Sequence, residues 1–139
     1  MAFLKELADR CSFYKINQLH LYIEHTFLFD GFSEVWRDDT PLTPEDILEL
    51  DAYCKALQID LVPSVATLGH LYKVLRTQSF HQLSEVEEPK DAPFSFYLRM
   101  CHHTLNVTDE DSLALVNRMI DQFLPLFSPS VQHQRGRAL

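Results

Sequence analysis

Three groups of side chains in this sequence could take part in acid–base, metal or sugar-binding chemistry. Glu24-His25-Thr26-Phe27 comes directly after an apolar stretch that is typical of a strand, Gly69-His70 follows a second such stretch by a few residues, and Cys101-His102-His103 precedes the last amphipathic helix. Histidine can transfer protons near neutral pH or bind a metal ion. Because ligand sites of parallel sheets form at the carboxyl ends of the strands, we expect these groups to face a pocket.

The histidines leave two alternatives open. His25, His70, His102 and His103 could build a metal-dependent hydrolase site, because neutral imidazole suits zinc and strand ends can converge. However, the sequence has no HxH pattern on a strand and no HExxH pattern. A histidine beside a strand end is more often a hydrogen-bonded structural residue. We therefore expect no metal site and no cofactor, and keep the metal-dependent hydrolase as an alternative.

Aromatic and acidic residues gather in the loop that follows the first predicted strand. Aromatic rings can stack on a sugar while carboxylates bind its hydroxyl groups, so this mixture suits carbohydrate binding. The same mixture fits a packed lid without a ligand equally well. The residues are Phe27, Phe29, Phe32 and Trp36, together with Glu24, Asp30 and Glu34.

Composition restricts the class of protein. The 139 residues fit one ordinary domain but are too few for a complete eight-fold α/β barrel, which needs about 250 residues. A formal charge of -8 argues against nucleic acid or an anionic membrane as partner, because both require clustered Lys and Arg. Without an apolar run of roughly 20 residues or a signal-peptide core, we expect a cytoplasmic protein. Three cysteines without a CxxC spacing indicate reduced thiols.

The chain opens with a helix and a strand. Apolar residues from Phe3 to Cys11 recur at helical spacing, which predicts an amphipathic helix that ends near Tyr14. Alternating β-forming residues over 16–23 predict a strand, and a long loop over 24–42 should follow it. This arrangement places Glu24 and His25 at the end of the first strand.

A second helix and strand repeat the pattern. Thr43 can cap a helix, Pro44 suits its first turn, and the two acids that follow favour the positive helix end. The helix should stop near Gln58, and Ile59 to Val62 should form a short strand that Pro63 closes. Strand, helix and strand then make one parallel unit with a right-handed crossover.

The second half of the chain is less regular. We expect a short helix over 71–76 and a polar surface loop over 84–93. Thr108-Asp109-Glu110-Asp111 repeats the capping pattern and should open a helix that Pro125 bends or ends.

The end of the chain departs from this alternation. A third strand is due near Ser130, but residues 128–139 (SPSVQHQRGRAL) are polar and basic. We therefore expect a single partial-barrel domain over 1–127 and an anomalous tail over 128–139 that is disordered or frame-shifted.

Several segments together resemble the catalytic barrel of glycoside hydrolase family 20, the β-N-acetylhexosaminidases. The resemblance implies an α/β fold, namely part of a (β/α)₈ TIM barrel with parallel strands and crossover helices, truncated at both ends of this chain. It runs in the family's order through nearly the whole chain up to Ser128. The segments are NQLHLYIEHTF (17–27), EVW (34–36), PLTPEDILELDAYCKALQIDLVPSVATLGH (41–70) and the helix before LFS (126–128).

The family resemblance implies substrate-assisted hydrolysis of terminal N-acetylhexosamine from glycans. The 2-acetamido oxygen of the substrate attacks the anomeric carbon, a Glu acts as general acid, and the Asp before it orients the acetamido group. This Asp-Glu pair is absent here, because no Asp or Glu follows Asp121. We therefore assign no catalytic residue and expect this chain to be inactive.

The same resemblance implies a set of substrate-binding residues. His70 of the Gly-His motif lies near the acid Glu in the family, Glu24 and His25 line the same pocket, and Trp36 is a candidate wall. The family's Pro-Gly-His motif appears here with Leu68 in place of its proline.

A frameshift would account for the tail. DNA that encodes Phe-Asn-Ile-Ser-Gly-Asp-Glu, a good version of the family's catalytic strand, can read as Val-Gln-His-Gln-Arg-Gly-Arg-Ala in a shifted frame, and that is 131–138 of this chain. The remaining alternative is a non-catalytic α/β module that binds sugar or self-associates through open barrel edges.

Overall fold

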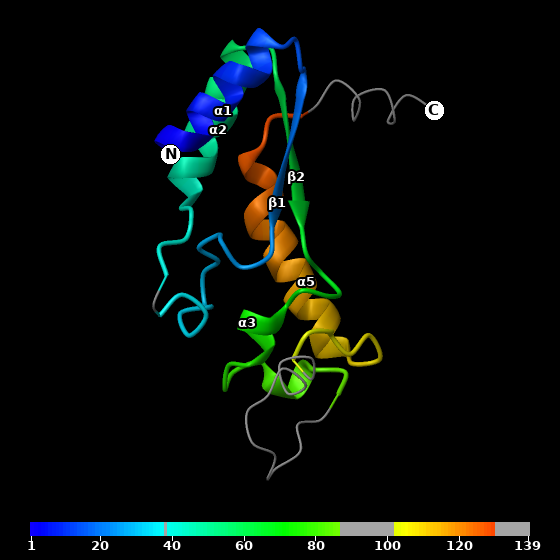
Figure 1. The fold of residues 1–139 in the computed structure, drawn as a ribbon. Helices are drawn as coiled ribbons and strands as arrows, with labels where there is room; N and C mark the ends of the chain where they lie inside the picture. The colour runs from blue at the N-terminus through cyan, green and yellow to red at the C-terminus, as the bar shows by residue number, and fades with distance from the viewer. Residues whose placement is uncertain (38, 87–101, 130–139) are drawn as a thin grey trace, which may run out of the picture. The chain divides into compact units, whose positions relative to one another are not determined.

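The computed structural model describes residues 1–37, 39–86 and 102–129, over which helices alternate with strands in the expected order (Figure 1). None of the helices in these ranges is long and apolar enough to cross a membrane. Most of the loop expected over 84–93 and the third strand expected near Ser130 lie outside the described residues. The elements are α1 (Ala2–Phe13), β1 (Gln18–Ile23), α2 (Pro44–Ala56), β2 (Asp60–Val65), α3 (Tyr72–Leu75) and α5 (Glu110–Phe123), with 3₁₀ turns at His81–Leu83 and Leu124–Leu126.

The described residues form two compact units. The first contains residues 1–22, 42–64 and 123–129, and the second contains 23–37, 39–41, 65–86 and 102–122. Helices α1 and α2 belong to the first unit, whereas the loops after both strands and most of α5 belong to the second.

The two strands are parallel. In the first unit the Asp60 amide donates to the Asn17 carbonyl, and in the second unit the Ala66 amide donates to the Ile23 carbonyl, so the pairing advances by six residues on both strands. Backbone groups of a strand point alternately to its two sides, so even-numbered residues of β2 face β1. The α/β fold class with parallel strands is therefore confirmed.

Strand β2 runs through Pro63 instead of ending before it, so our predicted end of this strand was wrong. Residue 63 is odd-numbered, and its backbone faces the outer edge of the sheet. Proline lacks an amide hydrogen, but at this position the ladder to β1 loses nothing. The strand therefore continues to Val65, closer to His70 than the sequence predicted.

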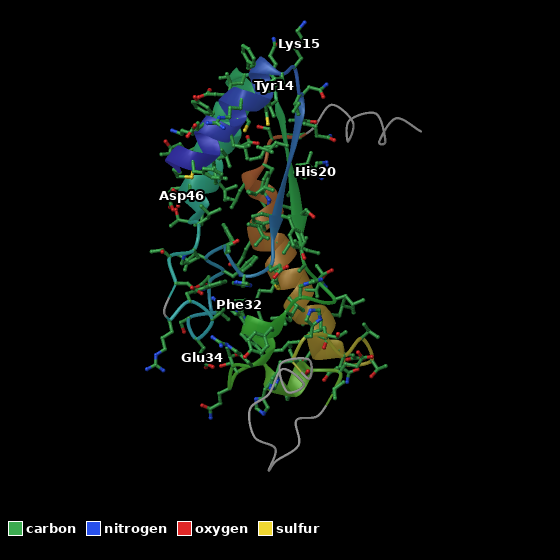
Figure 2. The ribbon with its side chains drawn as sticks, viewed as in Figure 1. Tyr14, Lys15, His20, Phe32, Glu34 and Asp46 are labelled. Atoms are coloured by element: carbon green, nitrogen blue, oxygen red, sulfur yellow. The ribbon has the colours of Figure 1, made fainter. Side chains whose placement is uncertain are left out.

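The same turn geometry joins each helix of the first unit to its strand. Lys15 and Gln58 have positive φ values of 58° and 59°. Their amides donate to the carbonyls three residues earlier, and the amides of Ile16 and Ile59 donate to the carbonyls five residues earlier. This is the Schellman pattern, in which the left-handed position is usually glycine. Figure 2 labels Lys15 at the end of α1.

Side-chain caps define the starts of α2 and α5. Thr43 and Asp46 form a complete capping box at α2, because Thr43 Oγ1 accepts from the Asp46 amide and the Asp46 carboxylate accepts from the Thr43 amide. At α5 the cap is Asp109, whose carboxylate accepts from the Asp111 amide at 2.9 Å. Thr108, which we expected to belong to this cap, donates its hydroxyl to Asn106 Oδ1 instead.

The core of the first unit lies between the two helices and the starts of the strands. Cys11 and Cys54 are buried there as free thiols, and burial raises the pKa of Cys54. The buried cluster consists of Ala8, Cys11, Leu50, Cys54, Ile59 and Leu61.

Candidate functional site

The ends of β1 and β2 bring Glu24, His25 and His70 together in the second unit. Parallel strands end at the same edge of a sheet, so the residues that follow them meet there. Glu24 Oε1 lies 3.4 Å from His70 Nδ1, and Glu24 Oε2 lies 3.9 Å from His25 Nδ1. The three polar residues predicted at the two strand ends are thus neighbours.

His70 combines an exposed ring with an unusual backbone. Its side chain is 61% exposed, against 33% for Glu24 and 28% for His25, so a ligand can reach its imidazole. Its φ of +62° lies in the left-handed region, which a non-glycine residue occupies only when its surroundings hold it there. Sequence reasoning identified His70 but not this conformation.

His103 lies directly against His70. The ring centroids are 4.7 Å apart, and the His70 amide donates to His103 Nδ1 at 3.4 Å. We predicted a chemical role for the Cys101-His102-His103 group only as a whole. In the structure His103 reaches the site, whereas His102 is a buried residue and Cys101 lies outside the described range.

Burial, supported by the charge of Lys73, favours the neutral form of His25. Burial lowers the pKa of His25 most, and the positive charge of Lys73 lowers it further, while the negative charge of Glu24 acts in the opposite direction. Lys73 forms an ion pair with Asp39, and its hydrogen bond lowers the pKa of that carboxylate. His25 is therefore suited to hydrogen bonding with a neutral polar ligand.

Long-range polar contacts hold the loop that carries Glu24 and His25. Asp30 donates its amide to Gln122 Oε1 at 2.7 Å, and its carbonyl accepts from Arg118 Nη2 at 2.7 Å. The Arg118 guanidinium also lies 4.8 Å from the centre of the Phe32 ring. Sequence reasoning missed Arg118 and Gln122, because on the sequence they are ordinary polar residues of an amphipathic helix.

Glu34 ties the same loop to the turn after α3. Its carboxylate accepts from Ser79 Oγ at 2.6 Å and from the Ser79 amide at 3.3 Å, which lowers the pKa of Glu34. Figure 2 labels Phe32 and Glu34 in this loop. In this geometry Glu34 anchors the loop to Ser79, and binding of sugar hydroxyls by Glu34 stays a prediction.

The aromatic residues of the loop form the core of the second unit. Phe27, Phe29 and Phe32 are at most 2% exposed, and Trp36 is 7% exposed with its ring centroid 6.3 Å from that of Phe29. These rings favour the packed-loop alternative over stacking on a sugar. A contact between Trp36 and substrate stays a prediction.

The described histidines and cysteines do not gather as metal ligands. Over the residues that the structure covers, no group of three or more His, Cys, Asp or Glu side chains could hold a metal ion. The metal-dependent hydrolase alternative therefore has no ligand set in this part of the chain.

Comparison of the sequence with known proteins finds similarity to two mammalian hexosaminidase D proteins. No family model matches the chain. It is 31% identical to bovine (Bos taurus) hexosaminidase D and 34% identical to the human (Homo sapiens) protein, over 110 residues, or 79% of this chain, in each case. The chain spans only 28% of the length of the bovine protein and 20% of the human one.

Solved structures agree in fold. The chain matches a chitobiase from Flavobacterium johnsoniae with a TM-score of 0.70 at 18% identity, over 89% of this chain and 19% of that one. It matches the N-acetyl-β-hexosaminidase of Streptomyces plicatus in complex with Thio-NAglucal with a TM-score of 0.68 at 20% identity, over 89% of this chain and 27% of that one. Sequence and fold together assign the chain to the glycoside hydrolase family 20 β-N-acetylhexosaminidases, of whose length it spans only part.

Proposed function

We propose that the chain supplies substrate-binding residues of a β-N-acetylhexosaminidase barrel that removes terminal N-acetylhexosamine from glycans. The observation that carries this proposal is the contact between Glu24 and His70, which follow two neighbouring parallel strands and lie 3.4 Å apart. A relative from Streptomyces plicatus has been solved with the product GlcNAc, which supports an N-acetylhexosamine as the ligand.

In this proposal Glu24 determines which ring nitrogen of His70 carries the proton. A carboxylate beside Nδ1 favours the tautomer that carries the proton on Nδ1, so Nε2 of this exposed side chain is left to accept a hydrogen bond. His25, held neutral by burial and by Lys73, offers a second polar contact without adding charge. Together the two histidines and Glu24 bind and orient the sugar.

The chain alone is proposed to bind without turnover. The resemblance implies an Asp-Glu pair after the last helix, where no Asp or Glu follows Asp121, and a general acid typically contributes about 10²–10⁴-fold to the rate. The strands described here are two, so the proposed barrel needs further strands to close. We propose that residues 131–138 of the tail are a frame-slipped copy of the catalytic strand, which reading the nucleotides that encode them would test.

Titration with N-acetylglucosamine tests this function. We expect the sugar to shift the NMR signals of the His25 and His70 rings in the purified chain, and His70→Ala to weaken binding by about tenfold. His20→Ala is the matched control, since His20 is exposed on β1 and its ring contacts nearby Gln18. An aryl N-acetylglucosaminide should not be hydrolysed. Absence of sugar-induced shifts would contradict the binding role, and turnover by this chain would contradict its inactivity.

We also propose self-association through the outer edge of β1. The sheet has two strands over the described residues, so each strand has one side without a neighbouring strand. Pro63 interrupts the outer edge of β2, because proline has no amide hydrogen to donate there. In β1 the backbone groups of odd-numbered residues face β2, so the backbone groups of Gln18 and His20 point to the outer edge. Sedimentation should show association that His20→Pro weakens and His20→Ala preserves. A monomer at every concentration would contradict it.

A further inference from the structure

The turn that carries His70 is enclosed by a segment distant in sequence. The Leu71 amide donates to the His103 carbonyl at 3.1 Å, and the Leu105 amide donates to the Leu68 carbonyl at 2.8 Å. These two backbone hydrogen bonds fix the residues on either side of Gly69 and His70. They leave the two residues between them to be held by something else.

Gly69 gives this turn a backbone that can adopt many conformations. Glycine loses more conformational freedom on folding than any other residue, so a turn that contains it needs additional contacts to keep one conformation. A methyl group at position 69 would lie 3.6 Å from His103 Cε1, which is an ordinary contact. The glycine is therefore compatible with the close packing of His103 but does not itself require it.

The imidazole of His103 supplies the missing contact. Its Nδ1 lies 3.4 Å from the His70 amide and accepts that hydrogen bond, and its ring packs edge-on against the His70 ring. An acceptor at Nδ1 must be unprotonated, so the neutral His103 ring carries its proton on Nε2. The bond acts on the one residue of the turn that has a φ of +62°.

We propose that His103 is the positioning residue of this site: it holds the backbone of His70 in the left-handed conformation that directs the His70 imidazole to Glu24. The part of the proposal that concerns sugar binding rests on the function proposed above. His103 itself acts through His70, and no contact between His103 and the sugar is required.

Hydrogen exchange of the His70 amide tests this role in the purified chain. We expect His103→Ala to raise the exchange rate of that amide by about five- to tenfold, as the loss of one hydrogen bond predicts. His103→Asn should return the rate to within about twofold of the original, because the side-chain oxygen of asparagine occupies nearly the position of Nδ1. His20→Ala, which removes an exposed histidine in the other unit, should change nothing.

The His70 ring provides a second readout that a purely structural role would not move. In His103→Ala the preference for the Nδ1-protonated tautomer, read from ¹⁵N chemical shifts of the ring, should decrease, and His103→Asn should restore it. If His103→Ala fails to fold, His103→Gln replaces it, since the longer side chain places its amide away from the Nδ1 position. Equal exchange in all variants, or no difference between the Asn variant and the Ala or Gln variant, would overturn the proposal.

The two proposals fail in different ways. If N-acetylglucosamine moves no signal of the unsubstituted chain, the proposed function is wrong, but the exchange comparison at His70 still decides the role of His103. If the sugar binds and the exchange rates do not change, the function stands and His103 has no positioning role.

Discussion

Different kinds of contact stabilise the interior of each of the two compact units. In the first unit, regular helices bury one face against the starts of two strands, and each helix ends in the same backbone turn at Lys15 or Gln58. In the second unit, a long loop is fixed by side chains from distant segments, such as Arg118 on Asp30 and Ser79 on Glu34. Repetition of local geometry builds the first unit, and specific long-range polar contacts build the second.

This difference has a functional meaning. The repeated turn is formed by backbone hydrogen bonds, whereas a loop held by individual side chains places those side chains and their neighbours at fixed points. The candidate site, with Glu24, His25 and His70, lies in the unit of the second kind. Loops placed on a rigid scaffold commonly carry binding and catalytic residues.

Gly31→Ala should give the largest effect and should act on the second unit. Gly31 has a φ of +78°, and an added Cβ would lie 1.9 Å from Arg118 Nη2. The backbone penalty and the loss of the Arg118 bond to Asp30 together predict a loss of about 2–3 kcal/mol in the free energy of unfolding, measured by urea denaturation. Gly69→Ala, which meets only an ordinary contact at 3.6 Å, is the control. Equal effects at both glycines would show that the clash with Arg118 does not cause the loss at Gly31.

Thr43→Ala should have an intermediate effect on the first unit. It removes the side-chain half of the capping box at α2 and should lower the free energy of unfolding by about 1 kcal/mol. Thermal or chemical unfolding measures the change, with the exposed Thr40→Ala expected to stay within about 0.5 kcal/mol of the original. A negligible loss at Thr43 would mean that packing alone defines the start of α2.

Substitution by glycine at the positive-φ positions should change the free energy of unfolding differently in the two units. Gln58→Gly should stabilise the chain by about 0.5–1 kcal/mol, because its side chain is not needed for the turn and glycine tolerates the left-handed conformation. Gln58→Ala retains the conformational penalty and should bring no gain. His70→Gly relieves the same penalty and keeps the backbone amide, but it loses the imidazole contacts with Glu24 and with the His103 ring, so it should not stabilise. If both substitutions stabilised the chain, the side chain of His70 would not be needed to hold its turn.

The pH dependence contributed by His25 should be the smallest effect. Its pKa in the folded chain lies below its ordinary value of 6.5, chiefly because of burial, so the unfolded chain binds more protons. The contribution of His25 to stability is therefore complete above pH 6.5 and is lost as the pH falls toward the lowered pKa.

Lys73→Met tests this assignment by NMR titration of the His25 ring. Removing the positive charge, which also frees the carboxylate of Asp39, should raise the pKa of His25. Lys5→Met, which breaks a comparable pair with Glu49 in the other unit, should leave it unchanged. A lower pKa in Lys73→Met would show that the charge is not a cause of the shift.

Sequence reasoning predicted the regular elements well and the irregular ones less well. The cap at Thr43 and the two helix–strand pairs follow from periodicity and local chemistry, and both appear in the structure. The end of β2 was misplaced because the sequence does not tell which edge of the strand Pro63 faces. The cap of α5 was assigned to Thr108 although Asp109 performs it, since several adjacent residues could each act as a cap.

The candidate site shows the same division. Glu24, His25 and His70 could be expected to meet because parallel strands end at one edge, and the structure brings them together. The participation of His103, the burial of Trp36 and the anchoring of the loop by Arg118 could not be derived, because each depends on contacts between segments far apart in the chain.

By itself, the sequence determined the α/β alternation, the family resemblance and the absence of any Asp or Glu after Asp121. These depend on residue types and on spacings of a few residues, where local periodicity and capping chemistry act. Only the tertiary structure decided that His70 adopts a left-handed backbone against His103 and that the loop aromatics form a core. The physical reason is that such contacts arise from the packing of segments many residues apart, which no local pattern encodes.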